Sequence, residues 1–293
     1  MLRYLLLQTL VMLSICAYSQ EITTGYQRAL GSVKRKQVYV TWGYNRAYYN
    51  RSDIHFEGDG YNFTLHDVAA EDMPEKFHSD VYLNPKQFTV PQFNFRAGYY
   101  FRDNTALSIG WDHMKYHIIQ TQLVEIDGYI DPEKYYNPEF TGQFNHEPIL
   151  YNPSFMDYHH SDGFNFIRIA LEKRLPFWRS RNGKHVLAMN GSVSLGTTMP
   201  WTDFTFFGVR HRNHPHFAGY GASVHAGFRY EFFNYFFLQV TAQCGWTNLV
   251  DIMLEDDLPS RAKQQITFFE RAWALGGYIP LTRQKREDRQ PAN

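Results

Sequence analysis

Apolar and polar residues alternate with a period of two through much of the chain. In Ala218–Phe232, Tyr220 and Phe228 fall on one face, whereas Ser223 and Arg229 fall on the other. Successive side chains of a β-strand point to opposite sides, so this pattern predicts a strand with one apolar and one polar face. Soluble sandwiches and membrane barrels both alternate in this way, so the arrangement of all such segments has to distinguish them.

Eight segments show this pattern in whole or in part, and each reaches the roughly 9–11 residues that a strand needs to cross a bilayer. They are Gln37–Tyr49, Pro91–Arg102, Thr105–Leu123, Gly163–Lys173, His185–Thr198, Ala218–Phe232, Tyr235–Val250 and Gln265–Leu281. Long and short connections take turns between them, the long ones being Asn50–Val90, Val124–Asp162, Met199–Phe217 and Asp251–Gln264. This arrangement predicts an all-β, antiparallel, up-and-down transmembrane barrel of eight strands with long extracellular loops.

Two of these strands depart from simple alternation. In the fourth, Phe164 and Phe166 share a face with Arg168 and Glu172, and in the eighth Arg271 falls on the apolar face. An arginine is tolerated there near the membrane surface, because its long side chain can reach the polar headgroups.

Aromatic residues gather towards the ends of the predicted strands. Phe101, Trp178 and Phe233 lie at short-turn ends, and Trp111 and Trp246 lie near one crossing length further along. Two bands at this spacing are typical of the aromatic girdles of a membrane barrel. An aromatic-rich soluble sandwich is the alternative.

The first 19 residues have the features of a secretory signal peptide. One early positive charge precedes an apolar run, Tyr4–Cys16, and small residues at Ala17 and Ser19 stand before Gln20. A lipobox-like pattern that ends at Cys16 leaves lipidation of this residue as an alternative. We therefore expect a signal peptide at 1–19, a periplasmic N-terminal segment at 20–36, the barrel at 37–281 and a charged periplasmic tail at 282–293.

Composition narrows the class of protein further. The 293-residue chain has a formal net charge of +0, which gives no support to nucleic acid as a partner. Mean hydropathy is −0.47, and no apolar run after the leader approaches the roughly 18 residues of a spanning helix. Cys244 is the one cysteine outside the leader, so packing and hydrogen-bonded closure have to hold the fold together.

The signal peptide, eight strands, one-sided long loops and aromatic belts together resemble the small outer-membrane β-barrels of Gram-negative bacteria. This resemblance covers the strands, while the loops match no family. It implies location in the outer membrane, contact with outer-membrane lipid and lipopolysaccharide, and insertion by the barrel-assembly machinery. Phe269–Leu281 resembles the C-terminal signal that this machinery reads, with Tyr278 and Leu281 near its end, although Pro280 and a charged tail depart from the usual aromatic ending.

A polar network is predicted inside the barrel. An eight-stranded barrel has an interior that side chains fill. Charged groups persist there only when they are paired, so we expect a plug of hydrogen bonds, with a narrow channel as the alternative. The inward residues of this network are Arg96, Arg168, Glu172, His225, Arg229, Glu231 and Glu270.

Small outer-membrane barrels include lipid A deacylases, acyltransferases and a protease family, so residues of catalytic type near the rim are candidates for an active site. Adjacent residues of a strand point to opposite sides and rarely build a Ser–His–Asp triad. The deacylase family carries a His-x-Ser pair late in the chain, whereas this chain has only the reversed Ser223-x-His225. The candidates are His159, His160, Ser161 and Asp162 in one cluster, and Asp112 and His113 in another.

The long loops are the expected site of function. Asn50–Val90 contains a predicted hairpin around Gly58–Gly60, which either extends the strands above the bilayer or makes ten strands. The histidine-rich stretch His211–His216 fits no closed metal site, and neither a metal nor a cofactor is expected. We expect a non-enzymatic role, structural, adhesive or partner-binding, with a surface protein or ligand as partner. A deacylase-like, lipid A-modifying hydrolase and a narrow channel are the alternatives.

Overall fold

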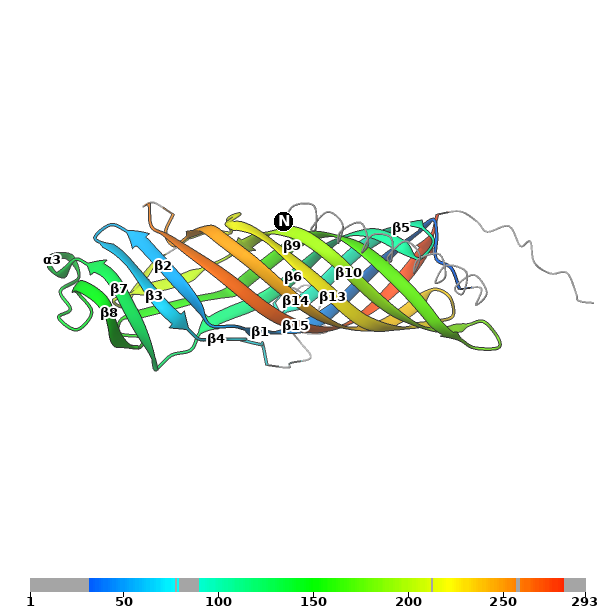
Figure 1. The fold of residues 1–293 in the computed structure, drawn as a ribbon, viewed down its shortest axis with the longest axis horizontal. Coiled ribbons are helices and arrows are strands. Elements are labelled where there is room, and N and C mark those ends of the chain that lie inside the picture. Colours follow the sequence, from blue (N-terminus) through cyan, green and yellow to red (C-terminus); the bar gives the residue numbers. More distant parts are fainter. Residues whose placement is uncertain (1–31, 77, 79–89, 212, 257–258, 282–293) are drawn as a thin grey trace, which may run out of the picture.

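Eight strands form a closed ring in which each strand is antiparallel to both of its neighbours (Figure 1). The computed structural model describes residues 32–76, 78, 90–211, 213–256 and 259–281. Around the ring the strands are β1 (Gln37–Tyr49), β5 (Phe93–Arg102), β6 (Thr105–Ile118), β9 (Met156–Arg179), β10 (His185–Pro200), β13 (Gly219–Phe232), β14 (Phe236–Met253) and β15 (Arg261–Pro280). β1 pairs with β15 along its whole length and closes the ring, so the predicted eight-stranded antiparallel barrel is confirmed.

The observed strand ends differ from the predicted ones most at two ring strands, β6 and β9. β6 ends at Ile118 rather than Leu123, because the chain turns near Thr121, whose φ of 62° lies in the left-handed region. β9 begins at Met156 rather than Gly163 and continues to Arg179, so the predicted connection between this strand and the next, 174–184, is shorter than expected. The predicted signal peptide and C-terminal tail lie outside the described residues.

The long connections build further strands above the ring, and we call this part of the molecule the extension. Its elements are β2 (Ser52–Gly58), β3 (Tyr61–Val68), β4 (Ala70–Glu71), β7 (Gln122–Ile130), α3 (Pro132–Tyr135), β8 (Gly142–Tyr151), β11 (Asp203–Phe206) and β12 (Val209–His211). β2 continues the line of β1 along β15, and β3, β7 and β8 follow edge to edge, at the left end of the barrel in Figure 1. The predicted hairpin around Gly58–Gly60 therefore extends the wall and adds no strand to the ring.

The interior of the extension is an apolar core. Phe63 lies at its centre, with ring centroids 5.1 Å from Phe56, 5.9 Å from Phe155 and 6.1 Å from Phe206. All four side chains are buried, and the core continues into the top of the ring through Met114. Burial of each such side chain contributes roughly 1.5–3 kcal/mol, so the connections are held as a packed body.

Below Met114 the interior of the ring becomes polar and charged, and we call this part the polar interior. The Arg168 Nε donates to Asp112 Oδ2 at 2.8 Å. The Gln243 side-chain amide donates to Asp112 Oδ2 and to Glu270 Oε2, at 3.0 Å in each case. Because partners replace water around these buried charges, the side chains fill the ring without leaving an unpaired carboxylate at its centre.

The short-turn end of the ring holds a caged arginine. Arg229 Nη1 donates to Tyr100 Oη at 2.8 Å and to Tyr278 Oη at 3.0 Å. Its guanidinium carbon lies 4.1 Å from the centroid of the Phe237 ring, close enough for a cation–π contact. These side chains close the ring below the polar interior.

The start of the described chain also enters this end of the ring. Arg174 donates to the backbone oxygen of Ser32 at 2.6 Å and pairs with Glu231, with Nε 2.6 Å from Oε1. The backbone N–H of Lys34 donates to Asn104 Oδ1 at 2.8 Å. Residues 32–36 are thus hydrogen-bonded into the mouth of the ring, at its short-turn end.

The outer surface of the ring is apolar between two aromatic belts. Ile109 and Val224 are exposed at mid-height, Phe233 lies in the belt at the short turns, and Trp246 lies in the belt below the extension. Arg271 interrupts the apolar part of the outer face of β15. Its guanidinium carbon lies 5.5 Å from the centroid of the Tyr48 ring in the upper belt. Among the described residues, no helix is long and apolar enough to cross a membrane.

Candidate functional site

Asp112 and His113 lie on opposite sides of the barrel wall. Asp112 points into the ring and accepts from Arg168. His113 points outwards, where its ring stacks on Phe93 at 4.9 Å and its Nδ1 lies 2.8 Å from Asn165 Oδ1. The two side chains therefore cannot act on one reacting group, as strand alternation requires.

The second candidate cluster is divided in the same way. His160 is buried in the apolar core, and burial lowers its pKa to about 3, which makes it a poor general base at neutral pH. His159 lies on the outer side, with Nε2 3.6 Å from Asp157 Oδ2. Within the described part of the chain, no hydrogen bond or ion pair joins Ser161 or Asp162 to either histidine.

The seven residues predicted to face the interior are all buried, each at most 5% exposed: Arg96, Arg168, Glu172, His225, Arg229, Glu231 and Glu270. Glu172 accepts from Ser108 Oγ at 2.6 Å, and His225 Nδ1 lies 2.6 Å from Ser192 Oγ. Sequence reasoning did not include Asp112 in this network. Asp112 lies four residues after the inward Ser108 on the same strand, so the period of two places it on the inner side as well.

Histidines of the third long loop contact carboxylates of the fourth. His214 Nδ1 lies 2.7 Å from Asp256 Oδ1, and His216 Nε2 lies 2.9 Å from Asp251 Oδ2. Three or more His, Cys, Asp or Glu side chains in an arrangement that could hold a metal ion do not occur among the described residues. These histidines therefore act as contacts between loops.

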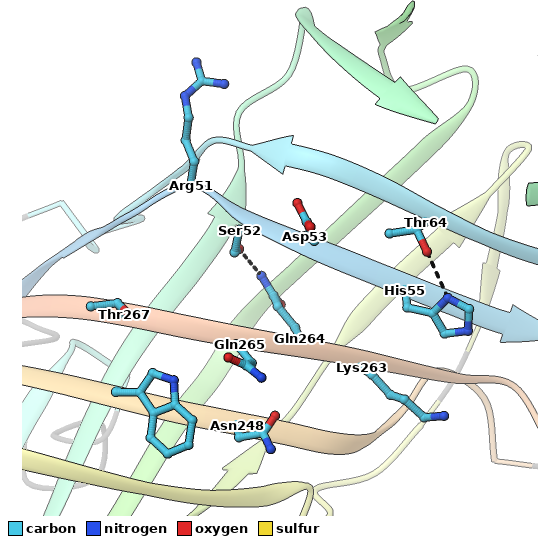
Figure 2. A pocket seen from close by; sticks show the side chains of 11 residues that line it. Arg51, Ser52, Asp53, His55, Thr64, Asn248, Lys263, Gln264, Gln265 and Thr267 are labelled. Atoms are coloured by element: carbon cyan, nitrogen blue, oxygen red, sulfur yellow. Dashed lines mark hydrogen bonds between the residues drawn. The ribbon is translucent and has the colours of Figure 1, made fainter. Parts of the chain in front are cut away.

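An open groove of about 640 Å³ lies on the outside of the wall, where β2 leaves β15 (Figure 2). Four residues, Asn50–Asp53, lie opposite three, Gln265–Thr267, between the pairing of β1 and the pairing of β2 with β15. Such a mismatch bulges a strand and interrupts its ladder of hydrogen bonds. Figure 2 shows Gln264 below this break, where its Nε2 donates to Ser52 Oγ at 2.9 Å.

The charged side chains of the groove have neighbours of opposite charge. Arg51 Nη1 lies 3.1 Å from Asp67 Oδ2, and Lys263 Nζ lies 3.9 Å from Glu57 Oε2. Burial and, to a smaller extent, the charge of Lys263 lower the pKa of His55, so its ring is neutral at neutral pH. The groove therefore offers charges that compensate one another.

Uncharged groups complete the lining of the groove. Within the described residues, no hydrogen bond engages the side chain of Gln265 or of Thr267. The Asn248 amide nitrogen donates to Tyr220 Oη at 3.1 Å, which leaves its oxygen available. The indole of Trp246 is 38% exposed and forms the lower edge.

The groove begins where the outer face of β15 changes from apolar to polar. Trp273 and Phe269 are exposed below it, and Thr267, Gln265 and Lys263 follow above on the same face. On a wall that faces lipid, this change marks the boundary between hydrocarbon and water.

A strand that crosses a bilayer needs partners for its backbone N–H and C=O groups, because unpaired groups are costly in hydrocarbon. The closed ring supplies these partners, and the apolar band between the two aromatic belts supplies a surface that lipid can cover. The chain is therefore a small transmembrane β-barrel of the outer-membrane type. Short turns of such barrels face the periplasm and long loops face the outside, which places the extension and the groove at the cell surface. This agrees with the predicted location in the outer membrane of a Gram-negative bacterium.

No protein-family model and no curated protein matches the chain. Solved structures of outer-membrane proteins are similar to it over most of its length, and the following three are examples. The outer membrane protein AlkL covers 86% of this chain and 94% of its own, at 9% identity and a TM-score of 0.39. The attachment invasion locus protein Ail of Yersinia pestis covers 84% and 100%, at 10% identity and a TM-score of 0.34. The outer membrane protein OprG of Pseudomonas aeruginosa covers 84% and 97%, at 10% identity and a TM-score of 0.36.

Sequence reasoning did not identify the groove. Its lining comes from β2, β3, β14 and β15, which lie at opposite ends of the chain and share no motif. The hairpin of β2 and β3 was predictable from its turn, but the mismatch that opens the groove depends on how the first and last strands meet.

Proposed function

We propose that this protein is a non-enzymatic binding protein of the cell surface, in which a filled barrel anchors a packed extracellular extension. The observation that carries the proposal is the contrast between a closed interior and an open, polar groove on the outside. Binding sites are concave and carry a few polar groups that fix a ligand, and the groove has both properties.

The filled interior favours this role over a channel. The aromatic side chains of the apolar core, the paired charges of the polar interior and the caged Arg229 follow one another along the barrel axis. An ion on this path would have to displace each layer, so we expect no conductance above baseline in planar bilayers.

The candidate catalytic residues lie apart from one another, which favours a binding role over the activity of a lipid A hydrolase. Acyl hydrolysis needs a nucleophile, a base and an orienting group within hydrogen-bond reach, and the described contacts of Ser161 and His160 supply no such arrangement. Lipid A from cells with and without the protein should therefore have the same mass spectrum.

The binding role is tested with full-length protein in phosphatidylcholine nanodiscs on a biosensor surface. The water-soluble and lipid fractions of the source organism's envelope are passed over it, with empty nanodiscs as the control. We expect saturable retention from at least one fraction by the protein alone. Equal signals from loaded and empty nanodiscs for every fraction would overturn the proposal.

A further inference from the structure

We infer that the groove beside β2 and β15 binds a saccharide, an inference that rests on the proposed binding role and names its ligand class. A sugar presents closely spaced hydroxyl groups that both donate and accept, together with an apolar ring face. A matching site needs uncharged donors and acceptors, a flat aromatic surface and no strong field of one sign.

The charges of the groove argue against a simple phosphate or sulfate site. Arg51 and Lys263 each have a carboxylate within 4 Å, at Asp67 and Glu57. Asp53 adds a further negative charge at the groove, where its Oδ1 accepts from the backbone N–H of Asp67 at 2.9 Å. An anion would meet these three carboxylates as well as the two cationic groups, whereas a neutral polyol meets donors and acceptors on all sides.

The uncharged lining fits hydroxyl groups. Gln265 offers an amide with both a donor and an acceptor, and Thr267 offers a hydroxyl two residues before the exposed Phe269 on the same outer face. His55 Nδ1 lies 3.0 Å from Thr64 Oγ1, and among the described residues no hydrogen bond engages Nε2, which the neutral ring can offer to a hydroxyl group. These groups surround the groove from β2, β3 and β15 (Figure 2).

Trp246 supplies the flat surface. Its indole lies at the lower edge of the groove and is 38% exposed, although its neighbours on the inner face of β14 are buried. An exposed indole at a membrane boundary has one apolar face available and an N–H for a polar partner. A sugar ring packed on this face would also reach Asn248 and Gln265, which line the same groove.

The height of the groove indicates where the saccharide comes from. Its lower edge coincides with the change from apolar to polar residues on β15, so an occupant sits at the level of the lipid headgroups. A sugar of a glycolipid in the outer leaflet reaches this level without leaving the membrane, and a soluble oligosaccharide can reach it from outside. Both sources present the same chemistry.

The test uses full-length protein in phosphatidylcholine nanodiscs and two probes. One is the delipidated core oligosaccharide of the source organism's lipopolysaccharide, measured by isothermal titration. The other is the intact lipopolysaccharide, incorporated into the nanodiscs and measured by native mass spectrometry as co-purifying lipid. Saturable binding of the oligosaccharide supports the site and a soluble source, and binding of the intact lipid alone supports the site and a membrane source.

Two variants connect binding to the groove. Trp246→Leu keeps an apolar side chain at the membrane boundary but removes the ring, and should weaken binding about tenfold. Gln265→Leu removes one amide and should weaken it about fivefold. Trp273→Leu is the matched control, because Trp273 is an exposed tryptophan of β15 outside the groove lining, and it should bind within about twofold of the wild type.

Three results would overturn the inference. They are the absence of binding of both probes, equal binding by Trp246→Leu and Trp273→Leu, and complete displacement of the probe by inorganic phosphate. The proposed binding role fails separately, when no envelope fraction is retained by wild-type protein. If wild type and Trp246→Leu retain an envelope fraction equally well, the proposed binding role is supported, and the inference that a saccharide binds in this groove is rejected.

Discussion

The polar interior and the apolar core are built from the same strands with opposite chemistry. Along β6 the inward residues are Ser108 and Asp112 in the polar interior, and Tyr116 in the apolar core. Along β15 the inward Glu270 is followed above by Ile266. On going from the ring into the extension, the inner side of the wall thus changes from polar to apolar, while the outer side changes at the same height from apolar to polar.

The difference between the polar interior and the apolar core follows from the solvent outside the wall, which decides which face of a strand is apolar. Where lipid surrounds the ring, apolar side chains point outwards and the narrow interior takes the polar ones, which then need partners. Above the membrane water surrounds the wall, so the same strands follow the rule of soluble sheets and bury their apolar face. Phe164 and Phe166 share a face with Arg168 and Glu172 because β9 crosses this boundary.

Removal of the Asp112 carboxylate should disrupt the hydrogen bonds of the polar interior and have the largest effect on the free energy of unfolding. Asp112→Ala leaves the buried Arg168 and Arg96 without their nearest carboxylate, and should lower the free energy of unfolding by about 3–5 kcal/mol. Urea unfolding in detergent, followed by tryptophan fluorescence, measures the change. Asp162→Ala is the matched control on an exposed aspartate and should stay within about 0.5 kcal/mol of the wild type. Equal effects of both variants would contradict a structural role for the buried charge.

Truncation of Phe206 should affect the apolar core and spare the ring. Phe206→Ala removes a buried ring that packs on Phe63 and Phe155, and should destabilise the extension by about 3 kcal/mol. Limited proteolysis should then cut the extension faster while the ring remains intact in mass spectra. Phe217→Ala, on a phenylalanine that is 61% exposed, should be cut like the wild type. An unchanged rate for Phe206→Ala would mean that the core does not hold the extension.

A smaller, pH-dependent effect on stability is expected at His117, which lies on the outer side of the wall near the upper end of β6. The contact with Asp157 is the main cause that raises the pKa of His117, and the same contact lowers the pKa of Asp157. The stabilisation is therefore lost as pH rises through the raised pKa of His117, and also as pH falls through the lowered pKa of Asp157.

His117→Gln should consequently lower the free energy of unfolding by about 0.5 kcal/mol near pH 5.5 and by almost nothing near pH 8.5. Thermal unfolding of the variant and the wild type at both pH values measures this difference. His146→Gln is the control, because His146 and its neighbour Glu125 are both mostly exposed. A deficit of the same size at both pH values would show that the contact acts through packing and not through charge.

Much of the ring could be predicted from the sequence because its outer face is in contact with one solvent. Ala218–Phe232 alternates cleanly since its outward residues along most of the strand, such as Val224 and Phe228, face lipid, and the predicted strand differs from β13 by one residue. Alternation also indicated the inward charges such as Arg229. Alternation from Ser108 also places Asp112 on the inner side, but only the structure shows that this carboxylate is paired with Arg168 deep in the ring and does not lie in an active site at the rim.

The sequence by itself determined the eight-stranded ring and the side of the wall on which each residue of its strands lies, because a period of two is a local property of the chain. Only the tertiary structure decided where the extension begins, which candidate residues are kept apart, and that a groove exists at all. These features depend on the offset between β1–β2 and β15, segments far apart in the chain, and this offset is defined only when the ring closes.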